Sequence, residues 1–154
     1  MFEKMAQKQW SKSDIKSFLE LHSYAQSIMD KKSAVAEDDG LLLVKGKPYF
    51  FSIDNEWYPT LHLLLENPAL LPKVVVDKGA IRFVVNGADI MRPGIVTADS
   101  WTQANQVVVI VDETVGKPIA VGKCSLTSEA LLATTSGKHI KNLHRIGDEI
   151  WNKK

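Results

Sequence analysis

The chain has 154 residues, a mass of 17.1 kDa and a formal net charge of +1 at pH 7, with 45% hydrophobic and 24% charged residues. This balance is typical of a globular protein and excludes disordered, collagen-like and coiled-coil chains. The longest unbroken apolar stretch, Val107–Val111, is far shorter than the about 20 residues that a membrane-spanning helix needs. With Cys124 as its single cysteine, the chain suits a reducing compartment, so we expect a cytoplasmic protein without a membrane partner.

The charges are distributed unevenly along the chain. Residues 1–72 hold eight Lys and Arg against ten Asp and Glu, whereas residues 73–154 hold eleven against eight. An excess of positive charge favours polyanionic partners. The C-terminal half is therefore the better candidate for such a partner.

Residues 1–72 carry the patterns of a small domain with a helix and a hairpin. The predicted elements are an amphipathic helix over 13–31, strands over 40–44 and 49–53, and a short helix over 61–65. Ser11 or Ser13 can cap the first helix, and Thr60 can cap the second. Pro72 is the predicted domain boundary.

Residues 73–154 read as a second domain that is richer in strands. The predicted elements are a strand over 74–76, a helix over 78–86, strands over 107–112 and 119–124, a helix over 128–134 after a Ser cap, and an extended segment over 141–151. For 78–86, Asp77 as a cap and Gly87 as a left-handed terminator favour a helix, while Phe83 and its β-branched neighbours favour a strand. Periodicity alone does not decide so short a run.

No pattern of catalytic residues is present. The phosphate-binding GxxxxGK[ST] and the dinucleotide-binding GxGxxG are both absent. The four histidines lack metal-ligand spacing and are expected mostly at the surface, and Cys124 ends a strand where a small core residue is the usual role. The sequence therefore predicts a protein that is not an enzyme and has no cofactor or metal.

The segment from Asp77 to Gly94 is rich in glycine and carries three cations. Glycine lets the backbone approach a ligand and exposes N–H donors that suit phosphate. The same glycines could simply end helices and form turns. The residues alone leave both interpretations open.

Two blocks in this segment, Val-Val-Asp-Lys-Gly-Ala-Ile-Arg-Phe and Asn-Gly-Ala-Asp-Ile-Met-Arg-Pro-Gly-Ile, resemble the signature of the PUA domain, a small RNA-binding pseudobarrel. Ile119–Lys123 resembles a later strand of that domain. The resemblance covers residues 73–152 and implies that 78–86 is a helix. The fold class is then α+β, with a small N-terminal α/β domain (1–72) before a PUA domain (73–154).

The chain is also similar to the malignant T-cell-amplified-sequence family and its archaeal relatives. The residues that carry this similarity are Trp57–His62, the Leu-Leu-Pro that ends at Pro72, and His144 and Trp151 near the end of the chain. This resemblance implies non-catalytic binding of structured RNA, either ribosomal RNA of the small subunit or tRNA, in translation initiation or recycling. A translation-factor partner is implied too, and DNA is not expected. The segment before Trp57 is shorter and more divergent than in the family.

The resemblance implies an RNA-binding face around the predicted 78–86 helix, in which Asp89 caps a turn or accepts from a base amine. Its candidate residues are Lys78, Arg82, Gly87, Ala88, Asp89, Met91, Arg92, Gly94, Lys123, Lys138 and His139. An RNA-targeting subunit of an RNA-modification enzyme is an alternative. A protein-interaction module that uses Trp10, Trp57 or Trp101 is another, although tryptophans more often pack in the core.

Overall fold

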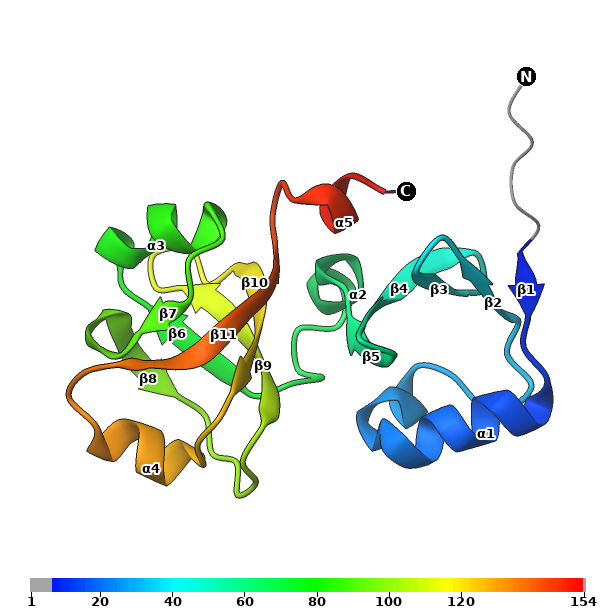
Figure 1. Ribbon diagram of the computed structural model, residues 1–154, viewed down its shortest axis with the longest axis horizontal. Helices are drawn as coiled ribbons and strands as arrows, with labels where there is room; N and C mark the ends of the chain where they lie inside the picture. The colour runs from blue at the N-terminus through cyan, green and yellow to red at the C-terminus, as the bar shows by residue number, and fades with distance from the viewer. Residues whose placement is uncertain (1–6, 154) are drawn as a thin grey trace.

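The computed structural model describes residues 7–153 and arranges them as two sheets side by side (Figure 1). The first has five strands in the order β1-β2-β3-β4-β5, and the second has six in the order β7-β11-β10-β9-β6-β8. The strands are β1 Lys8–Gln9, β2 Val35–Asp38, β3 Leu41–Val44, β4 Lys47–Ile53, β5 Glu56–Pro59, β6 Lys73–Val76, β7 Ile90–Met91, β8 Ile95–Ala98, β9 Gln106–Asp112, β10 Pro118–Cys124 and β11 Lys138–Arg145. The α-helices are α1 Lys12–Leu21, α2 Leu61–Glu66, α3 Lys78–Val85, α4 Ser128–Ala133 and α5 Glu149–Asn152. Within residues 7–153, no helix has the length and apolar character needed to cross a membrane.

Helix α1 is shorter than predicted. It begins at a capping box in which Ser11 and Asp14 satisfy each other's backbone N–H groups. It ends at Leu21, because His22 leaves the helical conformation with φ −128° and ψ 62°. The backbone N and the ring Nδ1 of His22 both lie 2.9 Å from the Phe18 carbonyl oxygen. The chain continues as a 3-10 helix over Ser23–Ser27. The apolar pattern extends beyond α1 because both helices pack on the same core.

The predicted hairpin is present as β3 and β4, which pair antiparallel, and the predicted short helix is α2, capped by Thr60. Strands β1, β2 and β5 were missed because they are short and partly polar. A two-residue turn joins β4 to β5, with Asp54 and Asn55 at positive φ angles of 50° and 66°.

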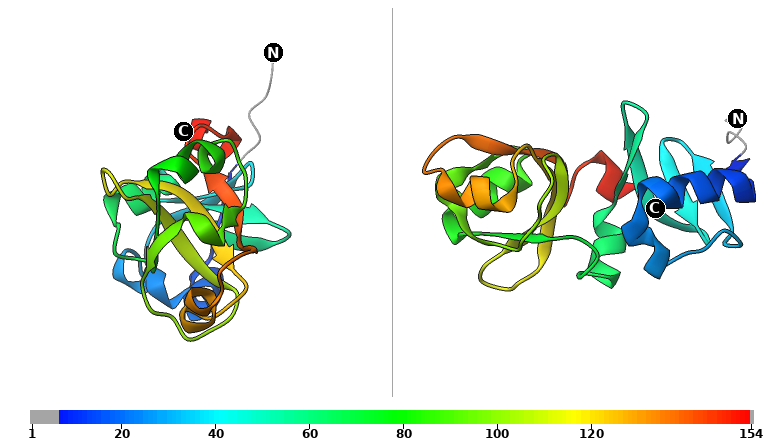
Figure 2. Two further views of the ribbon diagram at one scale, coloured as in Figure 1. Left: turned by 90° about the vertical axis from the view of Figure 1, so that its left-hand side faces the viewer. Right: turned by 90° about the horizontal axis from the view of Figure 1, so that it is seen from below.

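The six-stranded sheet curls into a half-barrel, visible end-on in the left view of Figure 2. Its strands pair antiparallel except β6 and β9, which run parallel. The predicted strands are confirmed as β6, β9 and β10, and the helix as α3, with Asp77 as its cap. The fold class is therefore α+β, as predicted.

Two predictions in this half need correction. Helix α4 is capped by Thr127 rather than by a serine. The segment 141–151 is not one extended element, because β11 ends at Arg145 and α5 follows, with the Asp148 side chain accepting from the Trp151 N–H. A side chain that accepts a hydrogen bond from an N–H in the first helical turn favours the start of a helix. The prediction of an extended segment did not take Asp148 into account as such a cap.

Strand β9 is buried on both faces, which explains its continuous apolar sequence. Val108 and Ile110 point into the half-barrel core, whereas Val109 and Val111 pack with α2 residues on the opposite face. Helices α2 and α5 both lie between the two sheets (Figures 1 and 2). The domain division at Pro72 stays a prediction.

Candidate functional site

A groove of about 520 Å³ lies beside α3, within the volume range of ligand sites. Its walls come from α3, the loop that follows it, the Pro93–Gly94 turn and the start of β11. Five of the sequence-predicted residues line it: Ala88, Asp89, Met91, Gly94 and Lys138. Lys138 and Met91 are partners across the β7–β11 pairing. We call this cavity the α3 groove.

Apolar side chains and Lys138 are exposed in this groove, and two further cations, Lys78 and Arg82, are exposed on α3 beside it. Phe83 is 54% exposed and Met91 is 45% exposed. The Arg82 guanidinium carbon lies 4.8 Å from the centre of the Phe83 ring. Lys78 and Lys138 are exposed as well. Exposed aromatic faces beside cations suit stacked bases and phosphates.

The loop after α3 is held by Asn142 of β11, a residue that the sequence analysis did not single out. Its side-chain amide donates to the carbonyl oxygens of Val84 at 2.9 Å and Ala88 at 3.0 Å. Its backbone N–H donates to the Asp89 carboxylate at 2.9 Å. Asp89 therefore anchors the loop to the sheet. A polar residue in a predicted strand gives no indication, from sequence alone, of which distant residue its side chain will contact.

Arg92 faces the protein more than the groove. Its guanidinium donates to the carbonyl oxygens of Leu131 at 3.2 Å, Ile95 at 3.3 Å and Leu132 at 3.4 Å. Of the five N–H donors of a guanidinium, three are thus engaged with the backbone. Arg92 ties α4 to the segment before β8.

Six candidates do not line the α3 groove. Besides Arg92, Lys78 and Arg82 lie on α3, Gly87 follows it, and Lys123 and His139 lie on β10 and β11. Lys123 points toward the first sheet, where its Nζ donates to Glu56 at 3.3 Å and to the Tyr58 hydroxyl at 3.2 Å. His139 has its Nε2 2.8 Å from the Ser136 carbonyl oxygen. The structure does not bring either residue to the lining of the groove.

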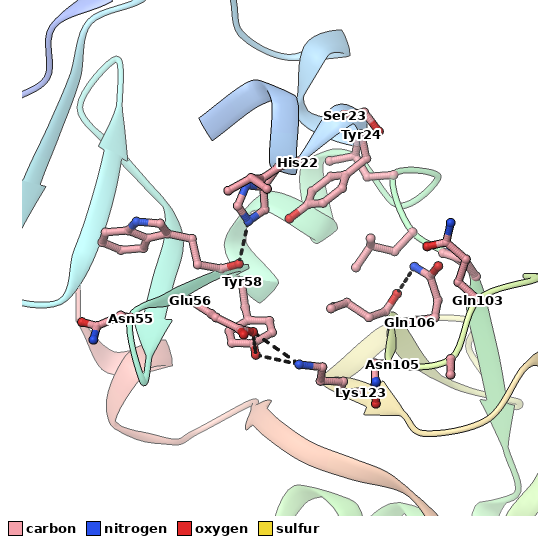
Figure 3. A pocket seen from close by; sticks show the side chains of 17 residues that line it. His22, Ser23, Tyr24, Asn55, Glu56, Tyr58, Gln103, Asn105, Gln106 and Lys123 are labelled. Atoms are coloured by element: carbon pink, nitrogen blue, oxygen red, sulfur yellow. Dashed lines mark hydrogen bonds and ion pairs between the residues drawn. The ribbon is translucent and has the colours of Figure 1, made fainter. Parts of the chain in front are cut away.

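The cleft between the two sheets is a second cavity, of about 580 Å³ (Figure 3). Its polar groups bond to one another: the Tyr58 hydroxyl donates to Glu56 at 2.6 Å, and the His22 ring reaches the Trp57 carbonyl oxygen at 3.1 Å. Hydrogen bonds from Tyr58 and Lys123 lower the pKa of the Glu56 carboxyl. The cleft thus holds an internal network that links β5 to β10.

A buried histidine joins the two sheets, against the expectation that the histidines lie at the surface. His144 of β11 is 1% exposed, and its Nε2 accepts the Leu61 N–H at 3.1 Å. Its Nδ1 then carries the proton and donates to the Asp148 carboxylate at 2.8 Å. Burial lowers the pKa of His144, although Asp148 acts in the opposite direction.

Trp101 and Cys124 are buried, whereas Trp10 and Trp57 are partly exposed. Trp101 is 6% exposed and its Nε1 donates to the Leu126 carbonyl oxygen, while Trp10 packs edge-on against Trp57. Cys124 is buried, and burial raises the pKa of its thiol. Among residues 7–153, no group of three or more His, Cys, Asp and Glu side chains could hold a metal ion.

The half-barrel and its α3 groove define a PUA-domain protein, and residues 72–146 match the PUA domain family. An uncharacterized protein of Methanocaldococcus jannaschii is 42% identical over 92% of this chain and 93% of that protein. Malignant T-cell-amplified sequence 1-B of Xenopus laevis is 34% identical over 91% of this chain and 82% of that protein. Translation machinery-associated protein 20 of Saccharomyces cerevisiae is 31% identical, with coverages of 90% and 82%. The chain belongs to the malignant T-cell-amplified-sequence family.

Solved structures share this fold over nearly the whole chain or over part of it. A hypothetical protein from Pyrococcus horikoshii OT3 superposes with a TM-score of 0.81 at 29% identity, covering 95% of this chain and 98% of that chain. A PUA domain from Aeropyrum pernix K1, in a tartrate complex, has a TM-score of 0.77 at 26% identity, with coverages of 95% and 89%. An H/ACA RNP bound to a substrate RNA matches 62% of this chain and 28% of that chain, with a TM-score of 0.50 at 26% identity.

Proposed function

We propose that this chain binds structured RNA through the α3 groove and performs no catalysis itself. The observation that carries the proposal is the exposure of Phe83, Met91 and Lys138 in this groove. The exposed cations Lys78 and Arg82 lie on α3 beside it, and Arg82 is stacked on Phe83. Cations can neutralise phosphates while the apolar side chains contact unpaired bases.

We further propose that the RNA belongs to the translation machinery, either the small ribosomal subunit or tRNA, and that the protein acts in initiation or recycling. The relative from Saccharomyces cerevisiae is named a translation machinery-associated protein, and its alignment covers 90% of this chain. A translation-factor partner is part of the same proposal. We place the RNA-binding unit in residues 73–154 and the auxiliary domain in residues 1–72.

An RNA-targeting subunit of an RNA-modification enzyme is the second candidate. The observation in its favour is the similarity to the H/ACA RNP, which was solved with a substrate RNA. Crosslinking in native cells and sequencing of the bound RNA would separate the two: fragments of the small subunit or of tRNA support the first, and guide RNAs support the second.

The binding surface is tested with Lys138→Ala and Lys78→Ala, measured by fluorescence anisotropy of a labelled RNA hairpin at several salt concentrations. Each variant should weaken binding, and each lost phosphate contact should flatten the log–log salt dependence by about 0.7–0.9. Lys31→Ala is the matched control, because Lys31 is exposed on the first domain. Salt dependences identical to that of Lys31→Ala would contradict the proposed surface.

A further inference from the structure

Arg145, at the end of β11, lies against the loop that follows α3. Its Nε donates to the Val85 carbonyl oxygen at 3.0 Å, at the last residue of the helix. A cation at this end of a helix is favoured by the helix dipole. This hydrogen bond fixes the plane of the guanidinium beside the loop.

Gly87 makes this approach possible. A Cβ atom at Gly87 would lie 3.2 Å from both Cζ and Nη1 of Arg145, tighter than ordinary contact, and the residue has a φ of +96°. A side chain there would therefore displace the guanidinium as well as strain the backbone. Ala88, the next residue, lines the α3 groove. The Arg145 guanidinium does not itself line the groove, but it lies against Gly87, the residue that precedes the groove-lining Ala88.

Two of the three guanidinium nitrogens of Arg145 are not used within the protein. In the part of the chain that the structure describes, no hydrogen bond involves its Nη1 or Nη2, and no carboxylate forms an ion pair with it. Asp148, the nearest acidic residue along the chain, accepts the backbone N–H of Arg145 instead, at 2.9 Å.

Arg92 makes the contrast clear, because its Nε, Nη1 and Nη2 all donate to backbone carbonyl oxygens. Arg145 is only partly exposed, so its guanidinium is partly removed from water. Because no carboxylate among residues 7–153 forms an ion pair with it, its positive charge is left without a partner there. The planar pair of donors at Nη1 and Nη2 matches the oxygens of a phosphate.

We infer that Arg145 binds a phosphate of the RNA backbone through its two η nitrogens, held in place by the Val85 carbonyl and the absence of a side chain at Gly87. This inference rests on the proposed function of the α3 groove. It extends the proposed RNA-binding surface beyond the groove to a cation that contacts Val85 and Gly87 but is far from them in sequence.

The test compares Arg145→Gln, Arg145→Lys and wild-type protein in salt-dependent hairpin binding, with thermal unfolding measured in parallel. Arg145→Gln should weaken binding and flatten the log–log salt dependence by about 0.7–0.9, since one phosphate contact is lost. Arg145→Lys should recover most of the salt dependence but only part of the affinity, because an ammonium cannot bind phosphate as a fork. A residue that only caps α3 would lower the unfolding temperature and leave the salt dependence unchanged, which would overturn the inference.

A second measurement uses the unaltered protein, so it does not depend on any variant folding. Phenylglyoxal modifies accessible guanidinium groups, and mass spectrometry reports the extent at Arg145. Hairpin RNA should protect Arg145 at low salt and fail to protect it at salt concentrations that abolish binding. Equal modification with and without bound RNA would overturn the inference. If wild-type protein binds no RNA at all, the proposed function fails; if it binds and Lys138→Ala weakens binding while Arg145 is unaffected, only the role of Arg145 fails.

Discussion

The α3 groove and the cleft between the sheets differ in how their lining side chains are bonded. In the α3 groove, the lining residues come from the 77–94 segment and from Lys138, and Phe83, Met91 and Lys138 expose their side chains. In the cleft between the sheets, residues far apart in sequence bond to each other, as Lys123 does to Glu56 and Tyr58 (Figure 3). The two volumes are similar, so size does not distinguish them.

This difference supports our proposal that the groove binds RNA. The cleft instead belongs to the set of contacts between the two sheets, which we call the joint. Beside the cleft, the joint is completed by His144, Leu61 and Asp148, and by Trp151 of α5, which stacks on His62 with ring centres 4.5 Å apart. Substitutions in the joint should therefore affect stability, and substitutions in the groove should affect RNA affinity.

The largest expected effect is that of His144→Ala. It removes the acceptor of the buried Leu61 N–H and the donor to Asp148, and it leaves a cavity, so the free energy of unfolding should fall by about 2–4 kcal/mol. Urea denaturation followed by tryptophan fluorescence measures this. His139→Ala is the control, since its ring contacts a neighbouring carbonyl at a partly exposed position. If the two variants had the same free energy of unfolding, His144 would not hold the two sheets together as we infer.

Acidification should weaken the same joint by a smaller amount. Burial, assisted by the charges of His62 and Arg145, lowers the pKa of His144 below its ordinary value of 6.5, and Asp148 only partly offsets this. As the pH falls below 6.5, the unfolded chain binds a proton before the folded protein does, so stability decreases until the lowered pKa is reached. The slope contributed by one group approaches at most about 1.4 kcal/mol per pH unit.

Urea denaturation at a series of pH values measures this dependence. In His144→Gln, the free energy of unfolding should depend less steeply on pH than in the wild-type protein, because glutamine does not titrate in this range. Asp148 does not contribute in this range: although burial raises its pKa, hydrogen bonds from Trp151, Arg145 and His144 hold the pKa below the ordinary value of 3.8. A wild-type slope as shallow as that of His144→Gln would contradict this prediction.

The smallest expected effect is that of Lys123→Ala. Its ion pair with Glu56 is largely exposed, and such pairs contribute little to stability. Since Lys123 points into the cleft, its removal should leave RNA affinity and salt dependence unchanged, in contrast to Lys138→Ala. If Lys123→Ala instead flattens the salt dependence as much as Lys138→Ala does, the RNA surface extends to the cleft and the comparison of the two cavities fails.

The sequence by itself determined the elements whose signals are local. Thr60 and Asp77 cap their helices because a side-chain oxygen reaches an N–H three residues ahead, and Gly87 ends α3 because it tolerates a positive φ. The apolar run of β9 marked a buried strand. The family resemblance rested mainly on the same contiguous segment, so five of the residues that line the α3 groove were among the sequence candidates, although Phe83 was not.

Tertiary structure alone decided the roles of residues whose partners are distant. Arg92 and Arg145 both lie between residues 73 and 154, yet the Arg92 guanidinium donates to three backbone carbonyls, whereas within residues 7–153 only the Nε of the Arg145 guanidinium forms a hydrogen bond. His144 gave no sign of burial, because its partner Leu61 lies 83 residues away. Local sequence specifies capping and backbone conformation, whereas the environment of a long side chain depends on which strands and helices fold against it.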